Sequence, residues 1–229
     1  SAARRTTTSS SPASLAHAAP RLKTTKQTDI MKFSKGIIAA VVAVLVLLWG
    51  VSKYNGLVGS QEQVNTAWAQ VENNYQRRAD LIPNLVNVVK GYASHERETL
   101  EGVIQARSRA TSTTIDANNM DEAALARFQQ SQDALSSALS RLMVVVEKYP
   151  ELKANEQFQT LMAQLEGTEN RIATARRDFN EIAKTYNLEV RSFPNSLIAG
   201  ITGFRPRPYF TAQAGSDVAP VVDFSSSQK

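Results

Sequence analysis

The 229-residue sequence contains no cysteine and only two histidines, His17 and His95. Without cysteine there can be no disulfide bond, no thiolate nucleophile and no lipid anchor attached to a cysteine. A zinc site would have to rely on carboxylates and one histidine, which is an uncommon set of ligands. A di-iron site in a helical bundle needs Glu-x-x-His on two helices, and the residue three positions before His95 is Tyr92. We therefore predict no metal site and no cofactor.

Recognisable catalytic motifs are also missing from the sequence. It contains no G-x-S-x-G, no phosphate-binding glycine loop and no H-E-x-x-H. No pattern places a nucleophile beside a base, so we predict no catalytic residue. These absences favour a protein that is not an enzyme.

A basic surface is not expected on the folded part, although the whole sequence has a net charge of +5. Residues 1–35 contain seven basic residues and one acidic residue, whereas residues 36–229 contain 19 basic and 20 acidic residues. Binding to nucleic acid needs a large basic patch, and this composition argues against one. We expect no nucleic-acid partner.

One long uncharged run is present, GIIAAVVAVLVLLWGVS at residues 36–52. As a helix, a run of this length covers roughly 26 Å, close to the hydrocarbon thickness of a bilayer. Lysines at both ends can reach the headgroups, and aromatic residues suit the membrane interface. We predict a membrane anchor over residues 31–53, with interface contacts from Lys35, Trp49, Lys53 and Tyr54.

Two alternatives to an uncleaved anchor remain at this stage. A buried helix of a soluble protein rarely continues this long without a polar residue. A cleaved signal peptide would use Met31–Lys35 as its basic segment, but no A-x-A-like site follows the apolar run. The positive-inside rule then places the N-terminus in the cytoplasm of a bacterial cell and the rest of the chain outside the inner membrane.

The two ends of the chain have compositions that do not support a core. Residues 1–30 are rich in serine, threonine and alanine, and we interpret them as a disordered tail, a transit peptide or sequence upstream of a natural start at Met31. Residues 211–229 are predicted to be a disordered tail. The segment between the anchor and this tail, residues 54–210, is the predicted folded domain.

Three amphipathic helical stripes run through residues 54–210. Apolar residues recur every three or four positions over residues 64–92, 125–149 and 158–190. The first stripe continues in phase through Pro83, which predicts a kinked but continuous helix with its break near Gly91–Ser94. Asn119 and Asn155 are the expected N-caps of the later helices, and Pro150 is the expected end of the second stripe.

The fold class predicted from these stripes is all-α. A transmembrane helix at the N-terminus is followed by an antiparallel bundle of three to four long helices joined by short links. A long parallel coiled-coil oligomer is the alternative, because stripes with this period suit both structures. Residues 201–210 are expected to form a strap along the bundle, or a contact with a membrane or partner.

Several polar residues fall on or beside the apolar stripes. The structural interpretation is a half-buried network that sets helix register, with Glu169 and Arg176 as its expected ion pair. The functional interpretation is a polar pocket between helices that binds a small ligand. The candidate network consists of Arg78, Asp80, Asn84, Glu147, Glu169, Asn170, Arg176 and Asn180.

The sequence resembles the LemA family of bacterial membrane-anchored helical proteins. The matching stretches are YNGLV at 54–58, RRADLIPNLVNVVKGYASHE at 77–96, the block at 141–180, and YNLEVRSFPNSLIAGITGF at 186–204. Ala79 and Phe179 depart from the tyrosines that the resemblance leads us to expect. The resemblance implies an antiparallel bundle on a single-pass anchor. No activity is established for the family, and some of its members are associated with magnetosome membranes.

The resulting hypothesis is a membrane-anchored scaffold that assembles with itself or with other envelope proteins. The rival hypothesis is an envelope enzyme or ligand sensor that uses the Arg/Asn/Glu cluster. The expected partners are the lipid bilayer and either a second copy or other envelope proteins.

Overall fold

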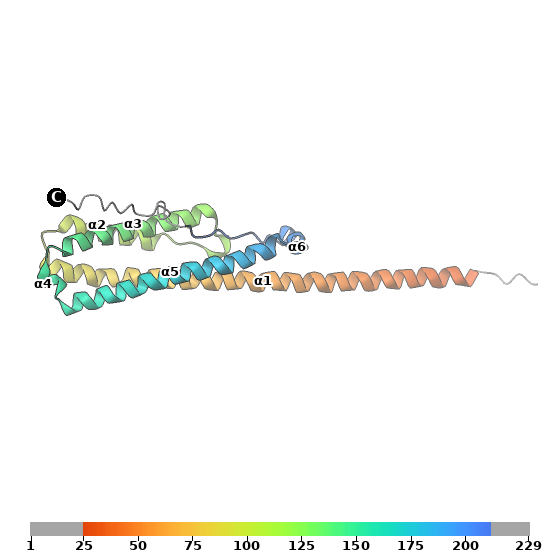
Figure 1. Cartoon of the computed structure of the whole chain (residues 1–229). Helices are drawn as coiled ribbons and strands as arrows, with labels where there is room; N and C mark the ends of the chain where they lie inside the picture. The colour runs from red at the N-terminus through yellow and green to blue at the C-terminus, as the bar shows by residue number, and fades with distance from the viewer. Residues whose placement is uncertain (1–24, 212–229) are drawn as a thin grey trace, which may run out of the picture. The chain divides into compact units, whose positions relative to one another are not determined.

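The computed structural model describes residues 25–211, with side chains from Lys35 onward. Over this range the regular structure is entirely helical (Figure 1), which confirms the all-α fold class. The helices are α1 (Thr25–Tyr92), α2 (Arg97–Ser112), a 3₁₀ turn (Ala117–Asn119), α3 (Glu122–Val146), α4 (Pro150–Lys153), α5 (Glu156–Arg191) and α6 (Asn195–Thr202).

The chain divides into two compact units, residues 1–49 and residues 50–229. In the first unit, the described residues belong to α1, and their apolar side chains are exposed, from 43% at Trp49 to 68% at Leu47. The most apolar window of α1 has a mean hydropathy of 2.2, and none of it is buried. By length and composition, α1 is able to cross a membrane.

The second unit is a bundle in which α1, α2, α3 and α5 lie side by side (Figure 1). Its core has two apolar clusters. One joins the end of α1 to α2, α3, α4 and the first turns of α5. The other joins residues 57–75 of α1 to the start of α3, the rest of α5 and Phe210. Because α2 follows α1 after only four residues, the two helices run antiparallel.

The predicted helix boundaries are partly correct. Asn155 caps α5 as expected, since its side chain accepts a hydrogen bond from the Phe158 N–H. The cap of α3 is Asp121 rather than Asn119, because the Asp121 carboxylate accepts from the Ala124 N–H at 2.6 Å. The predicted stop at Pro150 is also wrong: α3 ends at Val146, and Pro150 is the first residue of α4, where its missing N–H costs nothing.

The segments at the two ends also differ from the predictions. Residues 25–30, expected to belong to an extension outside the fold, are part of α1, because no proline or glycine interrupts them before the apolar run. Residues 201–202 complete α6, and the strap starts at Gly203, whose φ of 84° ends the helix. The predictions for residues 1–24 and 212–229 lie outside the described residues.

Pro83 lies inside α1, which continues to Tyr92, so the prediction of a continuous helix with its break after Gly91 is confirmed. Proline cannot donate to the carbonyl four residues earlier, which here is Ala79. The Arg107 side chain of α2 donates its Nε–H to that carbonyl oxygen at 2.7 Å. The acceptor freed by Pro83 therefore has a partner from the neighbouring helix.

This geometry predicts a coupling between Pro83 and Arg107. We expect Pro83→Ala to stabilise the bundle, and Arg107→Ala to destabilise the natural chain by about 1–2 kcal/mol, because a half-buried carbonyl loses its partner. In the Pro83→Ala background the cost of Arg107→Ala should fall by about 1 kcal/mol, since the new backbone N–H at position 83 would supply the missing bond. Chemical unfolding of the four variants measures this coupling, and additive effects would contradict it.

Candidate functional site

The most buried charged side chain among the described residues is that of Arg78, which is 2% exposed in the middle of the bundle. Its Nη1 donates to Glu169 and to the Ser136 hydroxyl, each at 3.0 Å. Its Nη2 donates to the Gln132 side-chain oxygen at 2.6 Å and to the Gln132 carbonyl at 3.3 Å. The guanidinium also lies 5.0 Å from the centre of the Tyr75 ring. One arginine on α1 thus connects α3 and α5.

Arg78 and its partners Gln132, Ser136 and Glu169 form a polar layer across the bundle. This layer separates the two apolar clusters of the core. On one side of Arg78, Tyr75 belongs to the second cluster, and on the other side Ile82 belongs to the first. Gln132 extends the layer to α2, because its Nε2 donates to the Ala110 carbonyl at 3.2 Å. Burial raises the pKa of the Tyr75 phenol, with the guanidiniums of Arg176 and Arg78 opposing the shift, so Arg78 faces a neutral ring.

The expected ion pair between Glu169 and Arg176 is wrong. Glu169 forms its ion pair with Arg78 at 3.0 Å, and its side chain is 44% exposed while that of Arg78 is 2% exposed. The guanidinium of Arg176 lies 4.7 Å from the centre of the Phe210 ring and donates to the Thr211 carbonyl at 3.1 Å. Helix rise explains the difference: the seven residues between them leave the two side chains on nearly the same side of α5 but roughly 10.5 Å apart along its axis, so each meets a different neighbour.

A second polar arrangement holds the strap, residues 203–211, against α5. The Asn187 amide donates to the Arg207 carbonyl at 2.8 Å and accepts from the Arg207 N–H at 2.7 Å. Asn180 repeats this pattern with Phe210, at 3.0 Å and 2.9 Å. The two asparagines replace the partner strand that an extended segment would otherwise need.

The spacing of these two contacts follows from helix and chain geometry. Seven residues of helix separate Asn180 from Asn187 and rise roughly 10.5 Å. Three extended residues separate Arg207 from Phe210 and advance roughly 9–10 Å. The strap therefore runs antiparallel to α5 in matched register, and it places Phe210 in an aromatic group with Trp68 and Phe179.

The remaining candidates for the polar network lie apart from both arrangements. Asp80 is exposed and accepts a hydrogen bond from the Gln76 amide of its own helix. Asn84 is exposed on α1, and Glu147 forms an exposed ion pair with Lys153 at 2.8 Å. Asn170 lies in the groove described below. The eight candidates thus belong to several places in the bundle and do not form one site.

Of the four residues predicted for the membrane interface, Lys35, Lys53 and Tyr54 flank the apolar run and Trp49 lies within it, and their contact with a membrane stays a prediction. Lys35 and Lys53 are exposed, as are Trp49 and Tyr54, at 43% and 42%. The ring of Tyr54 also lies 5.7 Å from the ring of Phe204 in the strap.

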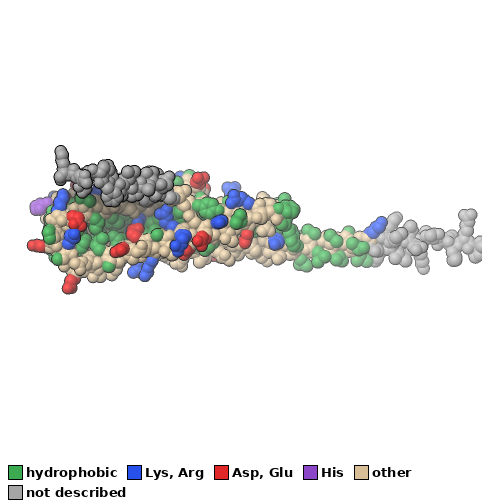
Figure 2. Space-filling model, in the orientation of Figure 1, with side chains coloured by type: hydrophobic (Ala, Val, Ile, Leu, Met, Phe, Trp, Pro, Cys, Tyr) green, Lys and Arg blue, Asp and Glu red, His purple; other side chains and the backbone are tan. Residues whose placement is uncertain are grey.

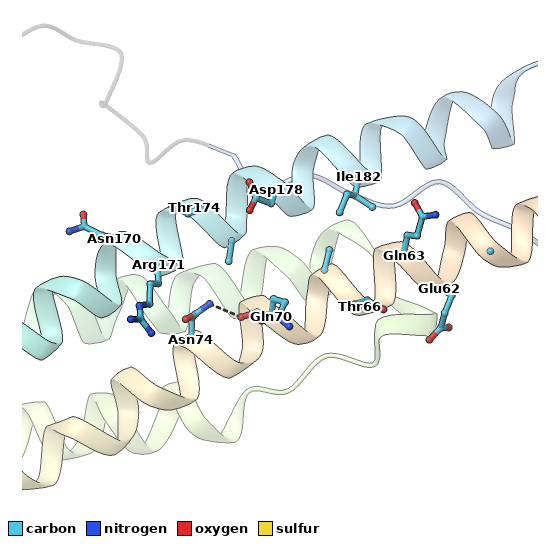
Figure 3. A pocket seen from close by; sticks show the side chains of 13 residues that line it. Glu62, Gln63, Thr66, Gln70, Asn74, Asn170, Arg171, Thr174, Asp178 and Ile182 are labelled. Atoms are coloured by element: carbon cyan, nitrogen blue, oxygen red, sulfur yellow. Dashed lines mark hydrogen bonds between the residues drawn. The ribbon is translucent and has the colours of Figure 1, made fainter.

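A groove of about 990 Å³ lies between α1 and α5 (Figure 3). Most of the side chains that line it are small, or are polar without a charge. The Asn74 amide donates a hydrogen bond to the Gln70 carbonyl within α1. Three charged side chains, those of Glu62, Arg171 and Asp178, also line it. The lining side chains labelled in Figure 3 are Glu62, Gln63, Thr66, Gln70, Asn74, Asn170, Arg171, Thr174, Asp178 and Ile182.

A basic cleft of about 690 Å³ lies on the other side of α5, beside the strap. Four cationic side chains and one carboxylate line it. These are Arg176, Arg177, Lys184, Arg191 and Glu181.

Sequence reasoning missed several participants in these arrangements. Gln132 lies on the second apolar stripe. A polar residue at such a core position was the available signal that it takes part in a buried hydrogen-bond network. Ser136 and Arg207 had no such signal, because serine is common on exposed helix faces and Arg207 lies in an irregular segment. Asn187 occurs in one of the stretches that resemble the family. It follows Asn180 by seven residues, so the two amides lie on the same side of the helix, and this spacing was the available signal for the contact with the strap.

In both polar arrangements the side chains are already hydrogen-bonded to other protein groups. Arg78 donates four hydrogen bonds to residues of α3 and α5. The amide of Asn187 both donates to the strap and accepts from it. Such groups fix register, while the groove and the basic cleft remain open to a partner. Among the residues from Lys35 to Thr211, no group of three or more potential metal ligands comes together.

Comparison with known proteins gives matches over most of the chain. The model of the LemA family matches residues 67–224. The chain is 28% identical to magnetosome protein MamQ 2 of Paramagnetospirillum magneticum, covering 84% of this chain and 75% of that protein. It is 27% identical to magnetosome protein MamQ of Magnetospirillum gryphiswaldense, covering 74% and 68% respectively. It is 24% identical to protein LemA of Metamycoplasma hominis, covering 65% and 64%.

Proposed function

This chain belongs to the LemA family, and on that premise we propose that it is a non-enzymatic, membrane-anchored helical scaffold of the bacterial envelope. The exposed apolar stretch of α1 supports the anchor. Two relatives are named magnetosome proteins, which supports a role in organising a membrane structure. The arrangement of lysines around the apolar run supports a cytoplasmic N-terminus in the inner membrane, with the bundle on the outer side.

The observation that carries the scaffold proposal is the groove between α1 and α5. It extends over several turns of both helices, and its small and uncharged side chains leave room for another helix. A groove of this length and shape suits a protein surface better than a small molecule, which is usually enclosed on most sides. We propose that this groove receives a helix of a second copy or of another envelope protein.

The test is the mass of the intact complex after gentle purification from the native membrane. We expect the chain to be recovered in a complex heavier than the monomer. Thr174→Arg, which places a long charged side chain in the groove, should release the monomer. Ser137→Arg is the matched control, because Ser137 is exposed on α3 and outside the groove. A monomer in the natural chain, or equal masses for both variants, would contradict the proposal.

The basic cleft favours one alternative function, an envelope sensor of an anionic ligand. Arg176 and Asn180 are unsuitable for testing it, because both also hold the strap. Lys184 lines the cleft and Lys184→Gln removes a charge there. An anion whose affinity for the full chain falls in this variant, with helix content unchanged, would favour the sensor.

A further inference from the structure

The outward face of α6 is apolar and almost fully exposed. Leu197 and Ile201 are spaced by four residues, which places them on one side of the helix, and they are 60% and 86% exposed. Phe193, in the turn directly before α6, is 81% exposed. On the opposite side Ala199 is 3% exposed and belongs to the core. A helix in contact with water alone would carry polar residues on that outer side.

This exposure is concentrated at one end of the bundle. Space-filling Figure 2 shows hydrophobic side chains gathered at the end where α6 lies. Most of the exposed large apolar residues described in the second unit lie on α6 or on the neighbouring turns of α1 and α5. They are Val51, Tyr54, Val58, Leu188, Phe193, Leu197 and Ile201. A concentration of exposed apolar residues of this kind indicates an interaction surface.

Two contacts place the segments on either side of α6 beside the first turns of α1 in this unit. The rings of Tyr54 and Phe204 are 5.7 Å apart, and the Ser60 hydroxyl donates to Glu189 in the last turns of α5. Tyr54 follows Trp49 by five residues, so the chain holds it within about 18 Å of the apolar stretch whatever the orientation of the two units. Along the helix α1 the same five residues rise only roughly 7.5 Å, which is comparable to the depth of one headgroup region, roughly 5–8 Å.

From these observations we infer that α6 is an interfacial helix, and that Leu197, Ile201 and the preceding Phe193 insert into the bilayer that holds the anchor. Basic residues next to the patch in sequence are complementary to anionic lipid headgroups, and the neighbouring carboxylate of Glu189 accepts a hydrogen bond from Ser60. Lys53 and Arg205 are exposed beside it, and Arg191 follows on the last turn of α5. An apolar face with basic residues at its edges is typical of helices that lie in the membrane surface.

This inference rests on the proposed anchoring and adds a second membrane contact. It predicts that the bundle end bearing α6 touches lipid, whereas the opposite end lies in water. A bilayer contact at both α1 and α6 would limit the tilt of the bundle and hold the groove between α1 and α5 in a defined orientation.

The absence of cysteine allows a direct test with single labels on the full chain. Val44→Cys in the anchor, Leu197→Cys on α6 and Val144→Cys on α3 each receive an environment-sensitive fluorophore. The chains are reconstituted in vesicles of phosphatidylcholine and phosphatidylglycerol. Val144 is the matched control, because it is 65% exposed, close to the 60% of Leu197, and lies on α3 outside the α6 patch. Quenching by nitroxide-bearing lipid and by aqueous iodide reports the surroundings of each label.

We expect lipid-borne quencher to remove about half or more of the emission at positions 44 and 197 and little at position 144. Iodide should show the opposite pattern. Equal quenching at positions 197 and 144 would overturn the inference while position 44 still reports lipid. A label at position 44 that reports water would instead contradict the anchor itself.

A second copy covering the α6 face gives a distinct result. The label at position 197 would then be shielded from both quenchers, and the shielding would weaken as the protein is diluted with lipid. This outcome also overturns the lipid contact. Phe193→Cys, in the exposed turn directly before α6, repeats the measurement in case the label at position 197 disturbs the helix.

Discussion

Arg78→Ala is expected to lower the free energy of unfolding by about 3 kcal/mol. The change leaves the buried Gln132 side-chain oxygen without the donor that now lies 2.6 Å away, and it opens space between α1 and α3. Glu169 contributes less to the loss, since its half-exposed carboxylate can be hydrated. In a unit of this size the melting temperature should fall by about 6–12 °C.

Thermal unfolding of the full chain in mild detergent, followed by circular dichroism, measures this effect. Arg77→Ala is the matched control, because Arg77 is the adjacent arginine and is exposed. We expect the control to change the free energy by less than about 0.5 kcal/mol. Glu169→Gln should cost less than about 1 kcal/mol, because an amide oxygen can still accept from Arg78. Equal melting temperatures for the two arginine variants would show that the polar layer does not stabilise the bundle.

Asn187→Leu is expected to release the strap from α5. Leucine has a similar size but cannot pair with the N–H and carbonyl of Arg207, and both groups lie in a buried environment. Leaving them unpaired should cost about 2 kcal/mol, which corresponds to roughly 30-fold faster hydrogen exchange at the Arg207 amide. The Phe210 ring, which stacks 5.9 Å from Trp68, should also become less ordered.

Hydrogen exchange followed by mass spectrometry of peptides covering residues 203–211 gives the measurement. Asn170→Leu is the control, since Asn170 is an asparagine of the same helix that lines the groove and does not contact the strap. Unchanged exchange in Asn187→Leu would mean that Asn180 and the aromatic contacts hold the strap without Asn187. Faster exchange in both variants would indicate general loosening of α5 and not a specific clamp.

The helical fold could be predicted from the sequence because the pattern that indicates a helix depends only on residues close together in the chain. Apolar residues every three or four positions define a stripe on any helix, whatever lies opposite it. The residues from Val64 to Val89 on this stripe are buried as the period requires, and the phase through Pro83 correctly indicated one continuous helix. Tyr92 is an exception, at 42% exposed, because the helix ends there.

The candidate site was less accessible, because its members come from distant parts of the chain. Arg78 was identified from its place on an apolar stripe, but its partners Gln132 and Glu169 are 54 and 91 residues away. The stripe indicates that a charge is buried and does not indicate which helix will supply the opposite charge. Pairing Glu169 with Arg176 failed for this reason, since it used proximity in sequence although seven residues of α5 set the two side chains roughly 10.5 Å apart along the helix.

By itself, then, the sequence determined the apolar stretch of α1, the long amphipathic helices, the cap at Asn155 and the family. Each of these depends on residues within a few turns of one another. Only the tertiary structure decided that Arg107 completes the backbone at Pro83, that Asn180 and Asn187 hold the strap, and that α6 presents its apolar face outward. Those features depend on which helices become neighbours and how each is rotated, and these follow from packing across the whole bundle.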